Sequence, residues 1–171
     1  MSVKKYQIAP FINTAIDSET GLVDKENPVW TRIKKTTSFD LNMNPQTEER
    51  DFISDKNPTI DLLRYAPTFN TPLVMYKGEA DYEFIFGKFY NLAVGEKAKA
   101  EVMLVFFQEP VDGAASPTHF LAWKAPCSIT INDLNSVDET ITFDVSFNGK
   151  TDVGYATVAG NSITFTKGTY S

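Results

Sequence analysis

The sequence predicts an all-β or β-rich fold: an antiparallel β-sandwich or partly closed barrel with one flanking α-helix, a projecting β-hairpin and a long loop. Several segments alternate apolar and polar residues with the period of two that half-buried strands require. Only one stretch repeats its apolar residues at the spacing of a helix face. A length of 171 residues is typical of one domain, so we expect a single domain over residues 1-171.

Composition is that of an ordinary soluble globular protein with an excess of aromatic residues. Apolar residues make up 42% and charged residues 22%, and 13 phenylalanines help to raise the aromatic share to 13%. Aromatic residues suit strands and interfaces. A net charge of −6 argues against tight binding of nucleic-acid phosphates. Charge alone indicates only solubility, although an acidic surface can also line a passage for nucleic acid.

The N-terminal part is expected to contribute an arm and the first strand. Residues 1-16 mix apolar and polar side chains without a clean period, which is typical of an arm or an edge strand. A turn near Gly21 and a polar loop separate them from a strand that begins near Val29. Its continuation alternates, and two polar side chains fall on the face opposite Phe39, Leu41 and Met43, namely Asp40 and Asn42.

Residues 38-76 are predicted to form a polar hairpin followed by a long loop. Asn44-Pro45 is a turn signal, because proline fixes its own φ and pushes the preceding residue out of the helical region. The arms of the hairpin carry too few apolar residues to lie inside a monomer, and such a segment is often stabilised by a neighbouring chain. Its acidic residues are Glu48, Glu49, Asp51 and Asp55. They form either a solvated face or a functional surface, such as a channel lining or a contact between subunits.

The helix is predicted over residues 81-94. Its apolar stripe consists of Tyr82, Ile85, Phe86, Phe89, Leu92 and Ala93. Asp81 is expected at the N-cap or in the first turn, and Gly95 is expected to end the helix in a left-handed C-cap. Gly87 lowers helix stability by about 1 kcal/mol relative to alanine, and close packing on the sheet would explain its presence.

The next two strands are expected to be buried. The run Val102–Phe107 is apolar on both faces, so both faces should be covered, one of them by the chain itself or by another subunit. A flexible loop then leads to a returning strand from His119 to Ile131, with a possible break at Pro126.

Residues 140-167 are predicted to form a three-strand antiparallel meander. Apolar residues alternate from Ile141 to Phe147, and Asn148-Gly149 follows as a turn signal. A two-residue loop would place Val145 opposite Asp152. A three-residue loop keeps one apolar face, and we favour it. The pairs that it predicts, together with the pair across the next turn, are Val145–Val153, Phe143–Tyr155 and Tyr155–Phe165.

Candidate catalytic and metal-binding residues are scarce, so we expect no enzyme, no metal and no cofactor. The only histidine, His119, precedes the only cysteine, Cys127, by eight residues on one extended segment. That spacing corresponds to roughly 25 Å along a strand, too far for a nucleophile and its base. Three acidic residues lie close together in the sequence at Asp133, Asp138 and Glu139. They lack the spacing of a calcium-binding loop, so we interpret them as part of a solvated turn.

The hairpin carries a sequence resemblance. After the Asn44-Pro45 turn come Thr-Glu-Glu-Arg-Asp-Phe-Ile at residues 47–53, Asn-Pro-Thr at residues 57–59, and then Tyr65 and Pro67. This pattern resembles the major tail tube proteins of long-tailed bacteriophages. The order of the expected elements extends the resemblance over nearly the whole chain.

The resemblance implies a structural protein without catalysis. Tail tube proteins stack as hexameric rings, and each subunit adds strands to a continuous inner β-barrel around a channel. The helix packs outside that barrel, and arms or loops tie the rings together. Implied partners are the chain itself, the tape measure, tail terminator and baseplate proteins, and DNA in passage without specific binding. The implied location is the virion tail, which is assembled in the cytoplasm of a bacterial host. No membrane is implied as a partner.

Carried onto this chain, the resemblance implies two sets of site residues. Candidates for the channel-facing positions are Asp40, Asn42, Glu49 and Asp51, with Glu48 and Arg50 as the alternative face of the hairpin. Candidates for the subunit interface are Phe52, Ile53, Leu62, Tyr65 and Phe69. Candidate contacts between rings are the arm Val3–Phe11 and the loop Asp55–Thr71.

Two other functions fit a β-sandwich of this composition. A secreted or surface carbohydrate-binding module would stack sugar rings on exposed aromatic residues such as Trp30, Trp123 and Tyr155. The N-terminus lacks the apolar core of a signal peptide, which argues against secretion and favours a cytoplasmic protein. A small hydrolase is the least favoured alternative, because no pair of carboxylates stands out.

Overall fold

The computed structural model describes residues 1–171 as a β-rich domain with one α-helix, which confirms the predicted fold class. Nine strands form one open antiparallel sheet that does not close into a barrel, and two more form a separate hairpin. The helical elements are η1 (Lys5–Gln7), α1 (Ala80–Tyr90) and η2 (Gly95–Ala98). The strands are β1 (Ile8–Asn13), β2 (Trp30–Arg32), β3 (Asp40–Asn42), β4 (Gln46–Arg50), β5 (Thr59–Arg64), β6 (Thr68–Val74), β7 (Lys99–Pro110), β8 (His119–Asn135), β9 (Thr140–Phe147), β10 (Asp152–Ala159) and β11 (Ser162–Lys167).

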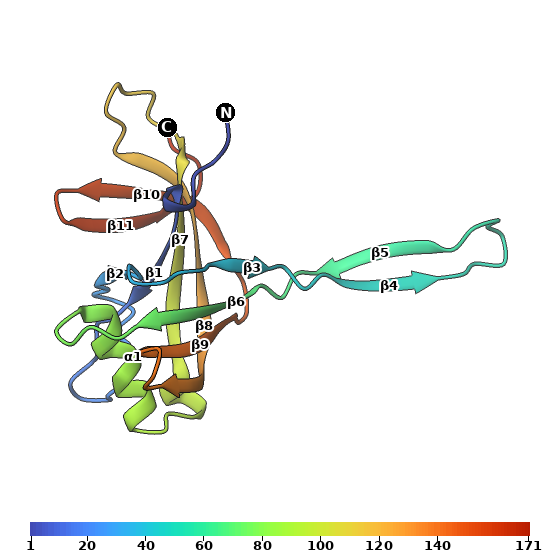
Figure 1. The fold of residues 1–171 in the computed structure, drawn as a ribbon. Coiled ribbons are helices and arrows are strands. Elements are labelled where there is room, and N and C mark those ends of the chain that lie inside the picture. Colours follow the sequence, from blue (N-terminus) through green and yellow to red (C-terminus); the bar gives the residue numbers. More distant parts are fainter.

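The large sheet bends into two layers that share its longest strand, β8. Its order is β2-β1-β7-β8-β9-β6-β3, and β10 and β11 branch from β8. The first half of the 17-residue strand β8 pairs with β10, and its second half pairs with β9. We call β2, β1, β7, β10, β11 and the first half of β8 the outer layer. The inner layer is the second half of β8 with β9, β6 and β3 (Figure 1).

Apolar clusters cover both faces of β7. Val102 belongs to a cluster that joins the inner layer to helix α1 through Ile85. Met103 and Val105 belong to a second cluster, which lies between β1, β8, β10 and β11. The predicted burial of both faces of this run is therefore confirmed, and the chain itself covers each face.

The N-terminal arm is shorter than predicted. Residues 8–13 form β1, which lies inside the sheet between β2 and β7. Five of its six residues are buried, because the run Ile-Ala-Pro-Phe-Ile-Asn has a neighbouring strand on each side. Of the predicted arm, Met1 to Gln7 precedes the strand and Thr14 to Ile16 follows it.

The predicted reversal at Asn148-Gly149 is wrong. Strand β10 does not pair with β9, because the chain continues along the same edge of β8 instead of turning back. The Asn148 N–H donates to the carbonyl of Pro126 at 2.8 Å, and Gly149 takes a φ of 60°. Regular alternation fixes which side chains share a face but leaves the partner strand open, so it was compatible with both arrangements.

The predicted register of the last hairpin is also wrong, by one residue. Ala156 rather than Tyr155 pairs with Phe165, and Ala159 pairs with Ser162. Gly160 has a φ of 61° at the first central position of the resulting two-residue loop, as a type II′ turn requires.

Helix α1 begins where predicted and ends earlier. Asp81 lies in the first turn, where its Oδ2 accepts a hydrogen bond of 3.1 Å from the Lys34 N–H. The C-cap is Asn91, and Leu92 follows it with a φ of 48°. The expected C-cap at Gly95 is therefore wrong, and this glycine opens η2 instead.

Replacing Gly87 with alanine should stabilise the protein. A Cβ at Gly87 would meet nothing within 4 Å, so the predicted close packing on the sheet is wrong. We expect Gly87→Ala to raise the free energy of unfolding by about 0.5–1 kcal/mol, measured by urea denaturation. Gly154→Ala is the matched control, because its Cβ would lie 2.1 Å from the Thr166 carbonyl oxygen and should destabilise the protein. Equal effects of the two changes would contradict this explanation.

The predicted hairpin is present and projects far from the sheet, but the long loop expected after it is wrong, because residues 59–64 form its second strand, β5, and residues 68–74 form β6. Strands β4 and β5 pair only with each other, and they extend away from the body on the side opposite α1 (Figure 1). Asn44 lies at its base with a φ of 43°, a conformation that asparagine tolerates. Its side-chain amide donates to the Ala66 carbonyl and to the Thr68 hydroxyl, each at 3.1 Å, and so ties the two chain segments together.

Candidate assembly surfaces

The inner layer has one apolar and one polar face. Leu41, Phe69, Phe143 and Val145 point toward the core. The strand registers place the alternate residues together on the other face. This polar face consists of Asp40, Asn42, Thr68, Asn70, Pro72, Val74, Ser128, Thr130, Asp133, Asn135, Thr140, Thr142, Asp144 and Ser146.

The polar face is acidic and contains no lysine or arginine. Asp40 and Asn42, two of the predicted channel residues, border a shallow hollow of about 310 Å³ together with Asp144. The Asn70 amide donates to Asp144 Oδ1 at 2.6 Å, which orients that carboxylate on the face. Sequence reasoning missed Asp144 and Asp133, although the alternation of β9 had already placed Asp144 opposite its apolar residues.

The inner layer ends in a free edge on each side. Strand β3 pairs only with β6. At the other side, pairing between β7 and β8 stops at Lys99 and Ser128, so residues 129–135 of β8 pair only with β9. A free edge presents backbone N–H and C=O groups that a further strand can bind.

The hairpin has two unlike faces, and its register separates the predicted channel residues. Thr47 pairs with Leu62 and Glu49 with Ile60, so Glu49 lies on the face that carries exposed apolar side chains. The opposite face is charged and carries Glu48, Arg50, Thr59 and Asp61, with an ion pair of 2.9 Å between Arg50 and Glu48. Asp51 follows β4 at the hairpin tip, away from Asp40 and Asn42 on the inner layer.

Four of the five predicted interface residues are exposed. They lie on the hairpin or at its base, and Ile53 is fully exposed. They are Phe52, Ile53, Leu62 and Tyr65. Ile60 and Leu63 are exposed there too and were not predicted. Phe69 is only 2% exposed and packs between the rings of Phe39 and Phe147, so it is a core residue and is left out of the interface proposed below.

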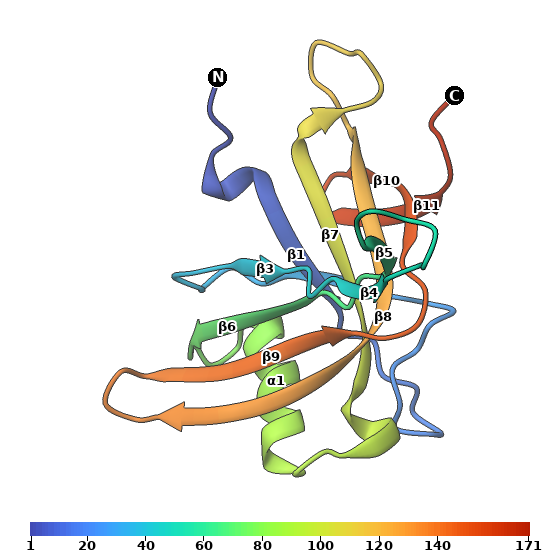
Figure 2. The same cartoon turned by 90° about the vertical axis from the view of Figure 1, so that its right-hand side faces the viewer.

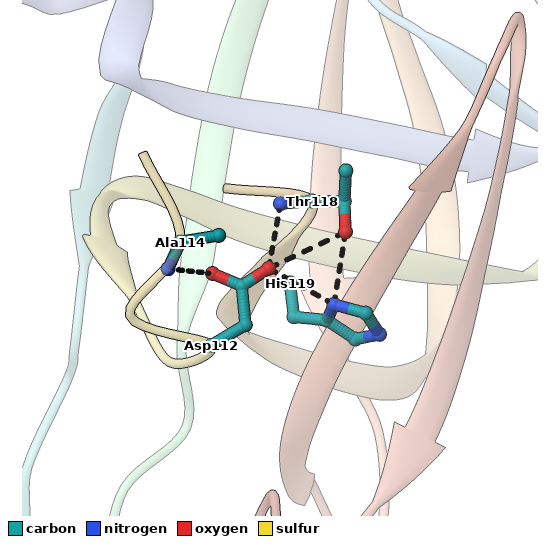
Figure 3. A network of polar contacts seen from close by, with 4 residues as sticks. All are labelled: Asp112, Ala114, Thr118 and His119. Atoms are coloured by element: carbon teal, nitrogen blue, oxygen red, sulfur yellow. Dashed lines mark hydrogen bonds and ion pairs between the residues drawn. The ribbon is translucent and has the colours of Figure 1, made fainter. Parts of the chain in front are cut away.

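A polar network fixes the loop between β7 and β8 (Figure 3). The Asp112 carboxylate accepts hydrogen bonds from the backbone N–H of Thr118 at 2.8 Å and of Ala114 at 3.4 Å. The ring of His119 lies 3.2 Å from the same carboxylate and against Tyr170 near the C-terminus. These hydrogen bonds lower the pKa of Asp112 from 3.8 to about 2, and the bond from the Thr118 N–H has the largest effect.

This network predicts a pH dependence of stability. A carboxyl group whose pKa is lower in the folded state contributes stability above its unfolded pKa and loses it as the pH falls. We expect the melting temperature of Asp112→Asn to fall less than that of the wild type between about pH 4 and about pH 2, because the variant lacks this carboxylate. Thermal melts across this range test it, with Asp55→Asn on the hairpin as the control. Identical pH profiles of Asp112→Asn and wild type would contradict the role of this carboxylate.

The cysteine, the possible metal ligands and the aromatic residues considered for sugar binding do not form a binding or catalytic site. Cys127 is completely buried in the core, as expected of a small apolar residue. No group of three or more His, Cys, Asp or Glu side chains is placed to hold a metal ion. Trp30, Trp123 and Tyr155, the aromatic residues considered for sugar stacking, are each partly buried rather than exposed. None of the helices is long and apolar enough to cross a membrane.

Comparison with known proteins gave only structural similarities. No protein-family model and no curated protein matches the chain. A chain from the tail of an empty GTA particle is 11% identical, with a TM-score of 0.49, over 96% of this chain and 99% of that one. A sheath/tube terminator of the PVC extracellular contractile injection system is 10% identical, with a TM-score of 0.48, over 90% and 96%. The tube-terminating cap of the anti-feeding prophage is 11% identical, with a TM-score of 0.43, over 98% and 93%. At such low identity and TM-score, these similarities carry no conclusion about function.

Proposed function

We propose that this chain is a structural subunit of a phage-type tail tube. Copies join edge to edge into rings, and the rings stack into a hollow tube. The observation that carries the proposal is the inner layer, which has a free edge on each side and a polar face without a cation. The sequence resemblance of the hairpin supports the same function, and in it the protein is a virion tail component rather than an enzyme.

The strand directions of the inner layer suit a closed ring. Neighbouring strands in β8-β9-β6-β3 are antiparallel, so β3 and β8 run in opposite directions. When β3 of one copy lies beside residues 129–135 of the next copy's β8, the antiparallel alternation continues across the junction. The same rotation keeps every polar face on the same side, and repeated rotation closes the ring. Six copies per ring are what the resemblance implies.

The polar face would line the channel. Asp40, Asp133 and Asp144 recur in every copy and give the channel the charge of DNA. Like charge prevents DNA phosphates from binding the wall, so DNA can slide through during ejection without specific contacts. Proposed partners along the tube are the tape measure protein inside it and the terminator and baseplate proteins at its ends.

Negative-stain electron microscopy with light scattering tests the proposal on the purified, concentrated full-length chain. We expect rings or hollow tubes of uniform width. Chains that remain monomeric at every concentration, both alone and after addition of preformed tube ends, would contradict it.

Reversing the charge of the polar face should make the channel retain DNA. In the double variant Asp40→Lys, Asp144→Lys we expect tubes that bind short double-stranded DNA at low salt and release it at high salt, because lysines exchange counterions with phosphates. Co-sedimentation of labelled DNA with tubes measures this, and wild-type tubes should leave the DNA in solution. The matched control is Glu19→Lys, Glu26→Lys, at two exposed positions between β1 and β2 that lie outside both the polar face and the hairpin. Equal DNA retention by both double variants would show that the polar face has no special access to DNA.

A further inference from the structure

A groove between the end of helix α1 and strand β8 carries unpartnered apolar surface. It measures about 920 Å³ and lies beside residues 128–134 of β8, next to the free edge of that strand. Leu92 and Val94 line it from the segment after α1, and Ile131 lines it from β8. Leu92 is 80% and Val94 78% exposed, which is costly for residues of this type unless another surface covers them.

The groove also holds a cation without a carboxylate partner. The Lys88 ammonium donates to the Lys97 carbonyl and lies 5.1 Å from the centre of the Phe84 ring. Partial burial lowers the pKa of Lys88, so its environment would favour an approaching negative charge. Lys99 lines the groove as well, although it already pairs with Glu96 at 2.7 Å.

The hairpin tip, residues 51–58, has the complementary composition. Phe52 and Ile53 are exposed at the tip, and the carboxylates of Asp51 and Asp55 flank them. The tip and α1 lie on opposite sides of the body (Figure 1), and Figure 2 shows the hairpin from its tip, with the body behind it. A projection on one side and a matching groove on the other make a head-to-tail contact, which repeats without limit when copies stack along one axis.

We propose that the hairpin tip of one copy inserts into this groove of a copy in the adjacent ring. Phe52 and Ile53 pack against Leu92 and Val94, and a tip carboxylate faces the Lys88 ammonium. This inference rests on the proposed function, because it names the receiving site for stacked rings. The same contact would cover the exposed apolar residues of the hairpin tip and those of the groove.

Disulfide cross-linking between two variants, each with one introduced cysteine, tests this contact directly. Under mild oxidation, Ile53→Cys protein is mixed with Val94→Cys protein that carries a mass-shifting tag, and a non-reducing gel separates the cross-linked heterodimer from either homodimer. The native Cys127 does not compete, because it is fully buried and burial raises its pKa to about 12. The matched control replaces the groove cysteine with Val153→Cys on β10, which is 63% exposed. We expect the heterodimer with Val94→Cys and only background with Val153→Cys.

Electron microscopy of the same samples separates the two proposals. Tubes without the Ile53–Val94 cross-link would overturn the groove contact and leave the proposed tube intact. Monomers without any cross-link would overturn both. Lys88→Glu should reduce tubes to single rings, while Lys88→Arg should assemble like wild type, and normal tubes from Lys88→Glu would contradict the role of the lysine. Melting temperatures of both variants identify any loss of folding.

Discussion

Deleting residues Glu48 to Ser54 should abolish tubes without destabilising the body of the subunit. These residues form most of β4 and half of the hairpin tip, and β4 pairs only with β5. Neither of the two core clusters contains a hairpin residue, so the deletion removes no core packing. It does remove Phe52 and Ile53, the exposed apolar residues at the tip. Electron microscopy reports the tubes, and urea denaturation reports the free energy of unfolding.

A control variant separates the loss of the hairpin from a general loss of apolar surface. Val153→Ser removes an exposed apolar side chain from β10 in the outer layer and should leave assembly unchanged. Tubes of normal length from the deletion variant would contradict the proposed function of the hairpin. An unfolding midpoint far below that of the wild type would instead show that the hairpin supports the body.

Replacing Phe69 with alanine should have the largest effect on stability. Phe69 is buried on β6, pairs with Val145 of β9 and packs edge-on against Phe39, with ring centres 4.9 Å apart. Removing a buried phenylalanine costs about 3–5 kcal/mol, from lost transfer energy and from the cavity left behind. That loss is a large part of the total stability of a domain. Urea denaturation measures it.

Tyr65→Ala is the matched comparison, because Tyr65 also lies near the base of the hairpin but is exposed. We expect it to change the free energy of unfolding by less than about 0.5 kcal/mol, as is usual for surface positions. If Phe69→Ala were as stable as Tyr65→Ala, the placement of Phe69 in the core would be wrong.

The faces of the strands were predictable from the sequence, whereas the neighbours of the strands were not. Alternation placed Asp40 and Asn42 opposite Leu41, and the structure has them on the polar face. The same alternation in β9 marked Asp144 as polar, but only the pairing with Asn70 shows that Asp144 belongs beside Asp40. Partner choice depends on the bend of a 17-residue strand, which leaves no local pattern in the sequence.

The hairpin was predictable because its signals are local, and its two faces were not. The Asn44-Pro45 turn and the scarcity of apolar residues predicted a projecting segment. Its register shifts at Gln46 and Thr47, where β5 contains one residue more than β4. A bulge of this kind moves every later side chain to the other face. Phe69 was misplaced for a different reason, since aromatic residues are typical of cores and interfaces alike.

The two layers of the sheet share β8, and this has a mechanical consequence. Layers joined only by loops can swing apart, whereas here any change in the angle between them must bend one continuous hydrogen-bonded strand of 17 residues. In a tube of the proposed kind, the wall of each ring would therefore be stiff, and its bore would keep one diameter whether the channel is empty or filled. Flexibility of the tube would then reside between the rings, where the proposed contact is made by a hairpin whose strands pair with no other strand of their own subunit.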